Sequence, residues 1–139
     1  MIFKATKENL KDINALGKLL YNNFEQIYLI EKYLLENNYI IIVDKEEELN
    51  GFMLVYKNID YYELELIIVS ENSRKQGIGT KLINHFIDNF LKKDDIILLE
   101  VSCENKVAIS LYKKFNFEII NIRKKYYNNV DAYVMKKVV

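Results

Sequence analysis

The fold is decided by the stretch Ile67-Ile68-Val69-Ser70-Glu71-Asn72-Ser73-Arg74-Lys75-Gln76-Gly77-Ile78-Gly79-Thr80-Lys81-Leu82. A run of β-forming residues ends in it, a polar loop follows, and a glycine pair opens an amphipathic helix. The first turn of such a helix presents backbone N–H groups at the positive end of the helix dipole, which suits a phosphate group. Glycines have no Cβ, so a pyrophosphate can approach the main chain closely. The stretch therefore indicates a phosphate site between a strand and a helix.

A structural turn would give the same pattern, because a tight turn also needs glycine for its backbone angles. The stretch lacks the Gly-Lys-Ser/Thr ending of a P-loop. It also lacks the third glycine of a dinucleotide-binding fingerprint, which would fall near Ile83 and Asn84. From the loop alone, a phosphate site and a purely structural turn stay equally open.

On both sides of this stretch, hydrophobic spacing predicts the other elements. Strands are expected at 1–6, 39–43, 52–56, 61–69, 96–101, 117–123 and 132–138, and helices from Thr6 to about 20, at about 23–36, at 80–90 and at 104–115. The Asn50-Gly51 pair is expected to close a hairpin turn over residues 44–51. Residues 96–101 are almost continuously apolar, which is typical of a strand covered on both faces.

This order of elements predicts the fold class. Hairpins come first and strand–helix–strand units follow, whose connections should be right-handed crossovers. We therefore expect an α/β domain with one mixed, twisted sheet and helices on both faces. The chain has 139 residues and shows no repeat or linker, so residues 1–139 should form one domain.

The composition excludes several classes of protein. Hydrophobic residues make up 50% and the 20 basic side chains balance the 20 acidic ones, which excludes disorder and argues against a broad nucleic-acid surface. One cysteine and one histidine exclude a disulfide framework and argue against a metal site of the zinc type. No apolar run approaches a membrane span, and the first residues lack the apolar middle of a signal peptide. We expect a cytoplasmic protein that binds neither nucleic acid nor membrane.

The pattern Gln/Arg-x-x-Gly-x-Gly/Ala is present at Arg74, Gly77 and Gly79. This stretch resembles the acetyl-CoA signature of the GNAT acyltransferase superfamily, and the order of elements also resembles that superfamily. The C-terminal third resembles the bacterial ribosomal-protein alanine N-acetyltransferases, the RimI type. The matching segments are Leu99-Glu100-Val101, Asn105, Ala108-Ile109, Leu111-Tyr112, Phe117, Arg123-Lys124-Lys125-Tyr126-Tyr127 and Asp131-Ala132-x-Val134-Met135.

The resemblance implies acetyl-CoA as the acetyl donor, and it implies a role for each matching position. The backbone of Ile67, Ile68 and Val69 would bond the pantetheine arm. The pyrophosphate would be wrapped by Lys75, Gln76, Gly77, Ile78, Gly79 and Thr80, beside Arg74 of the signature. Asn105 would contact the cofactor from the next helix, and Tyr112 would lie near its sulfur. The resemblance makes Glu100 the proton acceptor and Tyr112 the proton donor.

The physical chemistry of these two side chains agrees with the roles. Amine attack on a thioester needs a neutral amine, and a carboxylate whose pKa is raised by burial can accept the proton. Glu100 is the one charged residue within 96–101, which is costly unless it faces a cleft. A phenol has a pKa close to that of a thiol leaving group, so Tyr112 could protonate the sulfur. The alternatives are a strand-end glutamate in solvent and a core tyrosine.

Three further positions bear on the site. Glu65 is a reserve candidate for the base, although its alternation with Glu63, Leu64 and Leu66 is also typical of a half-exposed strand. Tyr126 and Tyr127 could line the acceptor groove or shield a sheet edge. Asn116 replaces the glycine of the family's Leu-Gly-Phe turn, and asparagine tolerates a left-handed backbone.

The sequence thus predicts an acetyl-CoA-dependent N-acetyltransferase that acts on a primary amine by direct transfer. The favoured acceptor is a protein N-terminal amine, with that of a ribosomal protein as one candidate. Two alternatives stay open: a small-molecule amine acetyltransferase of the same fold, and a non-catalytic acetyl-CoA-binding module that regulates a partner.

Overall fold

The computed structural model describes residues 1–127 and 129–139, and the side chains of these except Tyr126 and Tyr127. The elements are β1 (Ile2–Lys4), η1 (Lys7–Asn9), α1 (Leu10–Lys18), α2 (Phe24–Ile27), α3 (Ile30–Tyr33), β2 (Tyr39–Lys45), β3 (Leu49–Lys57), β4 (Tyr62–Val69), η2 (Glu71–Ser73), α4 (Ile78–Phe90), β5 (Ile96–Ser102), α5 (Lys106–Lys114), β6 (Glu118–Tyr127) and β7 (Val130–Val138). Within the described residues, every helix is too short or too polar to cross a membrane.

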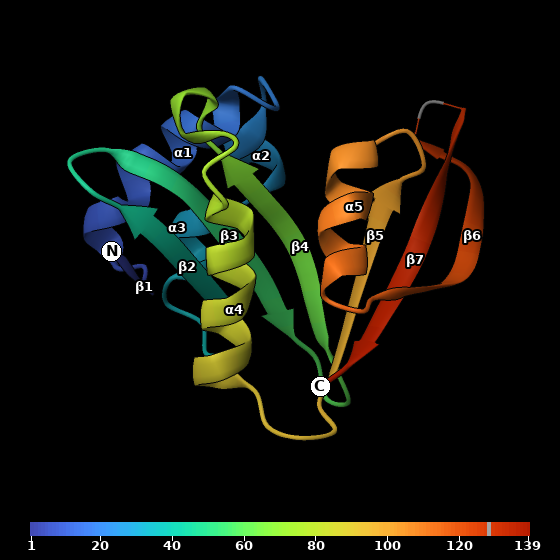
Figure 1. Cartoon of the computed structure of the whole chain (residues 1–139). Coiled ribbons are helices and arrows are strands. Elements are labelled where there is room, and N and C mark those ends of the chain that lie inside the picture. The colour runs from blue at the N-terminus through green and yellow to red at the C-terminus, as the bar shows by residue number, and fades with distance from the viewer. Residues whose placement is uncertain (128) are drawn as a thin grey trace.

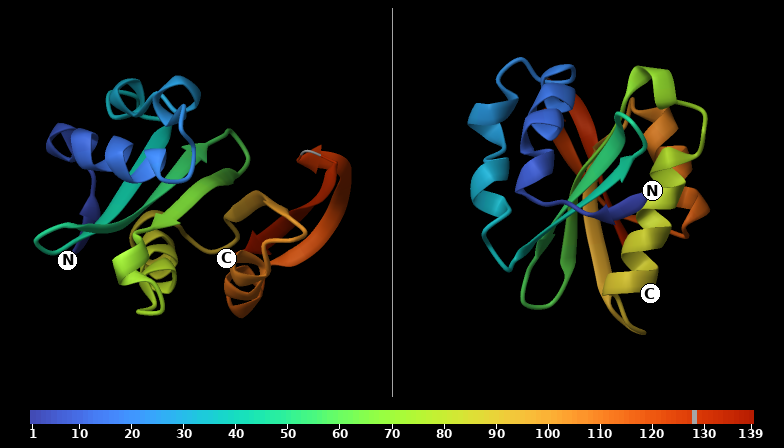
Figure 2. Two further views of the ribbon diagram at one scale, coloured as in Figure 1. Left: turned by 90° about the horizontal axis from the view of Figure 1, so that it is seen from above. Right: turned by 90° about the vertical axis from the view of Figure 1, so that its left-hand side faces the viewer.

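The described strands form one seven-stranded sheet in the order β1-β2-β3-β4-β5-β7-β6. Neighbouring strands are antiparallel except for β4 and β5, which are parallel. Helices α1, α2 and α3 cover one face and α4 and α5 cover the other, as both views in Figure 2 show. The predicted mixed sheet with helices on both faces is confirmed.

Each face of the sheet has its own hydrophobic core. The α4–α5 core contains buried residues of those helices and of the facing strands, among them Leu82, Phe86, Leu64, Leu99 and Tyr112. The α1–α3 core is built from side chains that point the other way from β2, β3 and β4, together with buried residues such as Ile13, Phe24 and Ile30. Burial of apolar area on both faces supplies most of the driving force for folding.

The single helix predicted at about 23–36 is wrong. The chain forms two separate turns, α2 and α3, because Tyr28 and Leu29 leave the helical conformation. In one continuous helix Phe24 and Ile30 would point about 120° apart, with Ile27 midway between them. The break turns both side chains into the α1–α3 core and leaves Ile27 47% exposed.

The hairpin predicted over residues 44–51 is confirmed, but the place given to Asn50-Gly51 in its turn is wrong. The charged residues 46–48 make the turn, and Asn50 and Gly51 lie within β3, where Gly51 pairs with Asp44. A Cβ on Gly51 would lie 2.8 Å from the carbonyl oxygen of Ile68. This glycine is therefore required by the close approach of β4 and not by a turn.

The C-terminal strands differ from expectation in two ways. In β5 the burial alternates, with Ile97, Leu99 and Val101 in the α4–α5 core and the residues between them half-buried, so the strand is not covered on both faces. The strands β5 and β6 are separated by β7, so the helix α5 joins two strands that are not neighbours.

Candidate active site

The strands β4 and β5 pair side by side over a short distance and then part. The register joins Tyr62 to Ile97, Glu63 to Leu98 and Leu64 to Leu99. Beyond Leu64 the strand β4 continues to Val69 beside β3, while β5 continues beside β7. Figure 1 shows the two strands diverging toward the end where the chain enters α4 and α5. From Glu65 onward, the edge of β4 on the β5 side is therefore not paired with β5.

A β-bulge marks the point where the strands part. Leu54 of β3 pairs with Leu66 and its neighbour Val55 pairs with Leu64, so Glu65 is an extra residue in β4. The bulge changes the faces of the strand, because Leu64 lies in the α4–α5 core and Leu66 in the α1–α3 core. The predicted pantetheine-binding residues Ile67 to Val69 follow the bulge directly, along the part of β4 that has left β5.

The loop from β4 to α4, residues 70–77, ends in a left-handed turn. Lys75 has φ 65° and Gly77 has φ 73°. The first helical hydrogen bond of α4 runs from the Lys81 N–H to the Gly77 carbonyl, 3.0 Å. The amides of residues 78–80 precede it, so they have no acceptor within the helix. With Arg74, Lys75 and Gln76 exposed beside them, these amides form an anion-binding arrangement.

The two glycines of the signature have different surroundings. A Cβ on Gly77 would meet nothing within 4 Å, so this position is open to a ligand. A Cβ on Gly79 would lie 3.0 Å from Leu111 Cδ2 of α5. Gly79 therefore lets α4 and α5 pack closely, whereas Gly77 combines a left-handed backbone with open space. The structure therefore leaves space beside Gly77 and the first-turn amides, where the sequence predicts the pyrophosphate.

Three glutamates, which we call the acidic group, lie on the face of the sheet opposite α4 and α5: Glu63, Glu65 and Glu100. Leu64 and Leu99 are the last paired residues of β4 and β5, and the next residue on each strand is a glutamate. Glu65 and Glu100 thus occupy equivalent positions where the strands part. Within the described residues, no group of three or more acidic, histidine or cysteine side chains is placed to hold a metal ion.

The glutamates differ in their electrostatic surroundings. Burial, together with the charge of Glu63, raises the pKa of Glu65 to about 7. Burial and the Glu100 charge also raise the pKa of Glu63, and Arg123 partly offsets this. Glu100 is 21% exposed and forms an ion pair with Arg123, with 3.1 Å between Oε1 and Nη2. Glu65 therefore has the pKa of a proton acceptor that works near neutral pH, while Glu100 is distinguished by its contact with Arg123.

Helix α5 brings the other predicted residues to the α4–α5 face. Asn105 is the N-cap, since its Oδ1 accepts a hydrogen bond from the Ala108 N–H, 3.2 Å. Tyr112 is 8% exposed, and its ring lies 5.7 Å from that of Phe117. After the helix, Asn116 has φ 65° and the Phe117 N–H donates to the Tyr112 carbonyl, 3.1 Å. The left-handed turn predicted at Asn116 is confirmed, and it fixes the backbone beside Tyr112.

The predicted acid and base approach the diverging strands from opposite faces. Tyr112 belongs to the core with Leu99 and Val101, and Glu100 alternates with these two residues, so it points the other way. The loop of residues 70–77 and the first turn of α4 are on the side of Tyr112. A thioester held on one face could thus meet an amine that arrives from the other.

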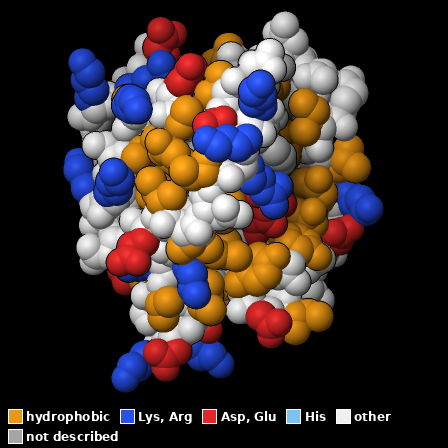
Figure 3. Space-filling view, turned by 90° about the vertical axis from the view of Figure 1, so that its right-hand side faces the viewer, with side chains coloured by type: hydrophobic (Ala, Val, Ile, Leu, Met, Phe, Trp, Pro, Cys, Tyr) orange, Lys and Arg blue, Asp and Glu red, His pale blue; other side chains and the backbone are white. Residues whose placement is uncertain are grey.

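Sequence reasoning missed the Glu100–Arg123 ion pair, although Arg123 is one of only two arginines in the chain. Figure 3 shows the side of the molecule formed by α5, β6 and β7, where basic and hydrophobic side chains are interspersed. The predicted groove residues Tyr126 and Tyr127 have side chains outside the described part of the chain, so the structure leaves that prediction untested.

Comparisons with known proteins agree with this geometry. The acetyltransferase (GNAT) family matches residues 9–117. A candidate [ribosomal protein bS18]-alanine N-acetyltransferase of Bacillus subtilis is 30% identical over 142 residues, covering 95% of this chain and 94% of that protein. The ribosomal-protein-S18-alanine N-acetyltransferase of Escherichia coli has a similar structure, with a TM-score of 0.87 at 22% identity, over 100% of this chain and 93% of that one.

A higher identity holds over a shorter stretch. N-alpha-acetyltransferase 50 of Danio rerio is 46% identical over 70 residues, which is 46% of this chain and 41% of that protein. The chain therefore spans less than half the length of this relative. The match with the acetyl-CoA signature, the parting of β4 from β5 and the family match over residues 9–117 lead to one conclusion: this chain belongs to the acetyltransferase (GNAT) family.

Proposed function

We propose that the protein transfers the acetyl group of acetyl-CoA to a protein N-terminal amine. The observation that supports this best is the position of Glu65 and Glu100 directly after the last β4–β5 pair, with the anion-binding turn at Gly77 on the other face. A relative from Sulfolobus acidocaldarius, 29% identical over 91% of this chain, is named an N-alpha-acetyltransferase, which also supports this acceptor.

Acetyl-CoA would be held by main-chain groups and cations. The amides of residues 78–80, with Arg74 and Lys75, would bind the pyrophosphate at the N-terminus of α4. The backbone of Ile67 to Val69 would bond the pantetheine arm along the edge of β4 that has left β5, much as an added strand would. Asn105 keeps two amide hydrogens for a contact, since only its oxygen caps α5.

The amine must lose a proton before or as it attacks. A carboxylate of the acidic group would accept this proton, and two positions are candidates. Glu100 is the base that the resemblance implies. Glu65 is favoured by its pKa of about 7, because a base acts best when its pKa is near the working pH. Tyr112 would donate a proton to the departing thiolate from the opposite face.

The test is thiol release from acetyl-CoA with a panel of amines. The panel contains a peptide with a free N-terminal alanine, the same peptide with a blocked N-terminus and an internal lysine, and spermidine. We expect release with the free N-terminus alone. Release with spermidine alone would identify a small-molecule enzyme instead. If acetyl-CoA raises the melting temperature and no amine causes release, the protein is a binding module.

A further inference from the structure

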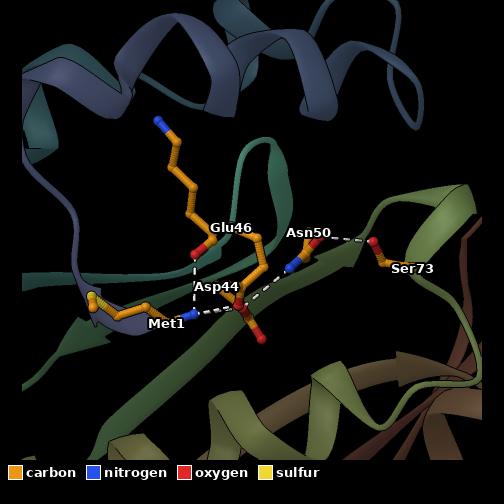
Figure 4. A network of polar contacts seen from close by, with 6 residues as sticks. Met1, Asp44, Glu46, Asn50 and Ser73 are labelled. Carbon is orange, nitrogen blue, oxygen red and sulfur yellow. Dashed lines mark hydrogen bonds and ion pairs between the residues drawn. The ribbon is translucent and has the colours of Figure 1, made fainter.

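Asn50 of β3 binds the turn that opens the loop of residues 70–77. Its backbone carbonyl accepts a hydrogen bond from the Ser70 N–H, 2.7 Å. Its side-chain Oδ1 accepts one from the Ser73 hydroxyl, 3.0 Å. Figure 4 shows the Asn50 side chain between Ser73 on one side and Asp44 on the other. The residue thus holds both ends of η2 from a neighbouring strand.

Asp44 determines which groups of this network donate and which accept hydrogen bonds. The Asp44 carboxylate is buried, and as an ion it can only accept hydrogen bonds. Asn50 therefore turns its Nδ2 toward Asp44 Oδ1, 3.3 Å, and its Oδ1 toward Ser73. Ser73 donates to Asn50 and so accepts from the Ser70 hydroxyl, 2.9 Å. The side-chain donors of Ser70, Ser73 and Asn50 thus all point from the loop toward the carboxylate, which the Met1 N-terminus meets from the other side, 3.7 Å.

The neighbouring Gly51 meets the other end of the loop. A Cβ on Gly51 would lie 3.1 Å from Ile78 Cγ2, so the first residue of α4 packs directly on this glycine. The adjacent residues Asn50 and Gly51 therefore hold the chain at Ser73 within the loop and at Ile78 directly after it. Residues 74–77 between these two points are exposed.

We propose that Asn50, oriented by Asp44, is a positioning residue for pyrophosphate binding, an inference that rests on the proposed function. It acts through Ser73 and touches no substrate atom. A loop held in its binding geometry before the ligand arrives loses less conformational entropy on binding, which raises affinity. The network should therefore govern affinity for a donor that has a pyrophosphate and leave the chemical step unchanged.

The experiment compares two acetyl donors in Asn50→Ala and Ser73→Ala. Acetyl-CoA contains the pyrophosphate, and S-acetylpantetheine ends before it. We expect the KM for acetyl-CoA to rise about tenfold, the effect of about one hydrogen bond, with kcat retained. The kcat/KM for S-acetylpantetheine should stay at the wild-type value. Asn58→Ala is the matched control, since Asn58 follows the other end of β3 and bonds Tyr61.

An exchange of the acid and the amide between positions 44 and 50 tests the direction of the hydrogen bonds. Asn50→Asp alone places a second carboxylate against Asp44, so its KM for acetyl-CoA should rise at least as much as in Asn50→Ala. The double variant Asp44→Asn, Asn50→Asp restores a donor at position 44 and an acceptor for Ser73 at position 50, so we expect the KM to recover. Equal losses for both donors, or variants equal to wild type, would overturn the inference. A wild-type protein that releases no thiol from either donor would instead refute the proposed function.

Discussion

The guanidinium of Arg123 reaches across β7 to the carboxylate of Glu100, with Nη2 and Oε1 3.1 Å apart. This ion pair joins β6 to β5 beside the position where β4 and β5 part. Arg123 also lowers the pKa of Glu63, against the opposing effects of burial and of Glu100. A single cation thus moderates the mutual repulsion of the acidic group.

We predict that Arg123→Gln will move the acid limb of the pH–rate profile to higher pH. Without the cation, the glutamates repel each other more strongly and bind protons more tightly. The stability loss should stay below about 1 kcal/mol, because Arg123 is 51% exposed. Lys124→Gln is the control, since Lys124 lies on the same strand and pairs with Asp131 instead. An acid limb that does not move would show that Arg123 has no influence on the base.

Glu65→Gln and Glu100→Gln should separate the two candidate bases. Loss of the base should depress turnover most at low pH and less at high pH, where more of the acceptor amine is already neutral. The variant that shows this pattern identifies the base, and the other should change kcat/KM with little dependence on pH. The measurement is kcat/KM for the free N-terminal peptide across the neutral pH range. If neither variant shows the pattern, the proton goes to water.

Glu65 should also make the stability of the protein depend on pH. Its pKa is about 7 in the folded protein, against an ordinary value of 4.5 for a glutamate in water, so folding favours the protonated form. The contribution of protonated Glu65 to the free energy of unfolding is therefore complete below pH 4.5 and is lost as the pH rises through about 7. Glu65→Gln should therefore be more stable than wild type at about pH 8, by about 1–2 kcal/mol after allowing for solvent screening, and equal to it at about pH 4. Urea unfolding at both pH values measures the difference, and a gain of the same size at both would contradict the assignment.

Tyr112→Phe should lower turnover about 10²–10⁴-fold while acetyl-CoA affinity stays nearly intact, because it removes a proton donor and keeps the ring. Single-turnover kinetics and equilibrium binding separate the two quantities. Tyr62→Phe is the control, since Tyr62 packs against the same core at the opposite end of the paired strands. Full activity in Tyr112→Phe would make Tyr112 a core residue only.

The two signature glycines should respond differently to substitution. Gly77→Val places its side chain beside the first-turn amides and strains the left-handed backbone at φ 73°, so it should abolish the acetyl-CoA-induced rise in melting temperature. Gly79→Val should mainly destabilise the fold through the contact with Leu111. Adding Leu111→Ala should then recover stability and acetyl-CoA binding. If the double variant is stable and binds no acetyl-CoA, Gly79 serves the ligand as well.

The sequence by itself determined most of the element order and the chemistry of the loop. The spacing of hydrophobic residues and the clustering of Arg74, Gly77 and Gly79 are local signals. They can be recognised within one segment without knowing which distant residues that segment contacts. Local signals failed where a distant contact overrode them. The Asn50-Gly51 pair has the composition of a turn, but Ser73 and Ile78, which approach it from beyond β4, fix its place within β3.

Tertiary structure alone decided where the strands part, which faces the side chains take and which charges meet. The bulge at Glu65 arises from pairing with Leu54 and Val55, and a one-residue insertion changes the face of every residue that follows. Arg123 meets Glu100 only because β7 places β6 two strands away from β5. Such contacts depend on register between strands far apart in the sequence, and no spacing within one segment encodes them.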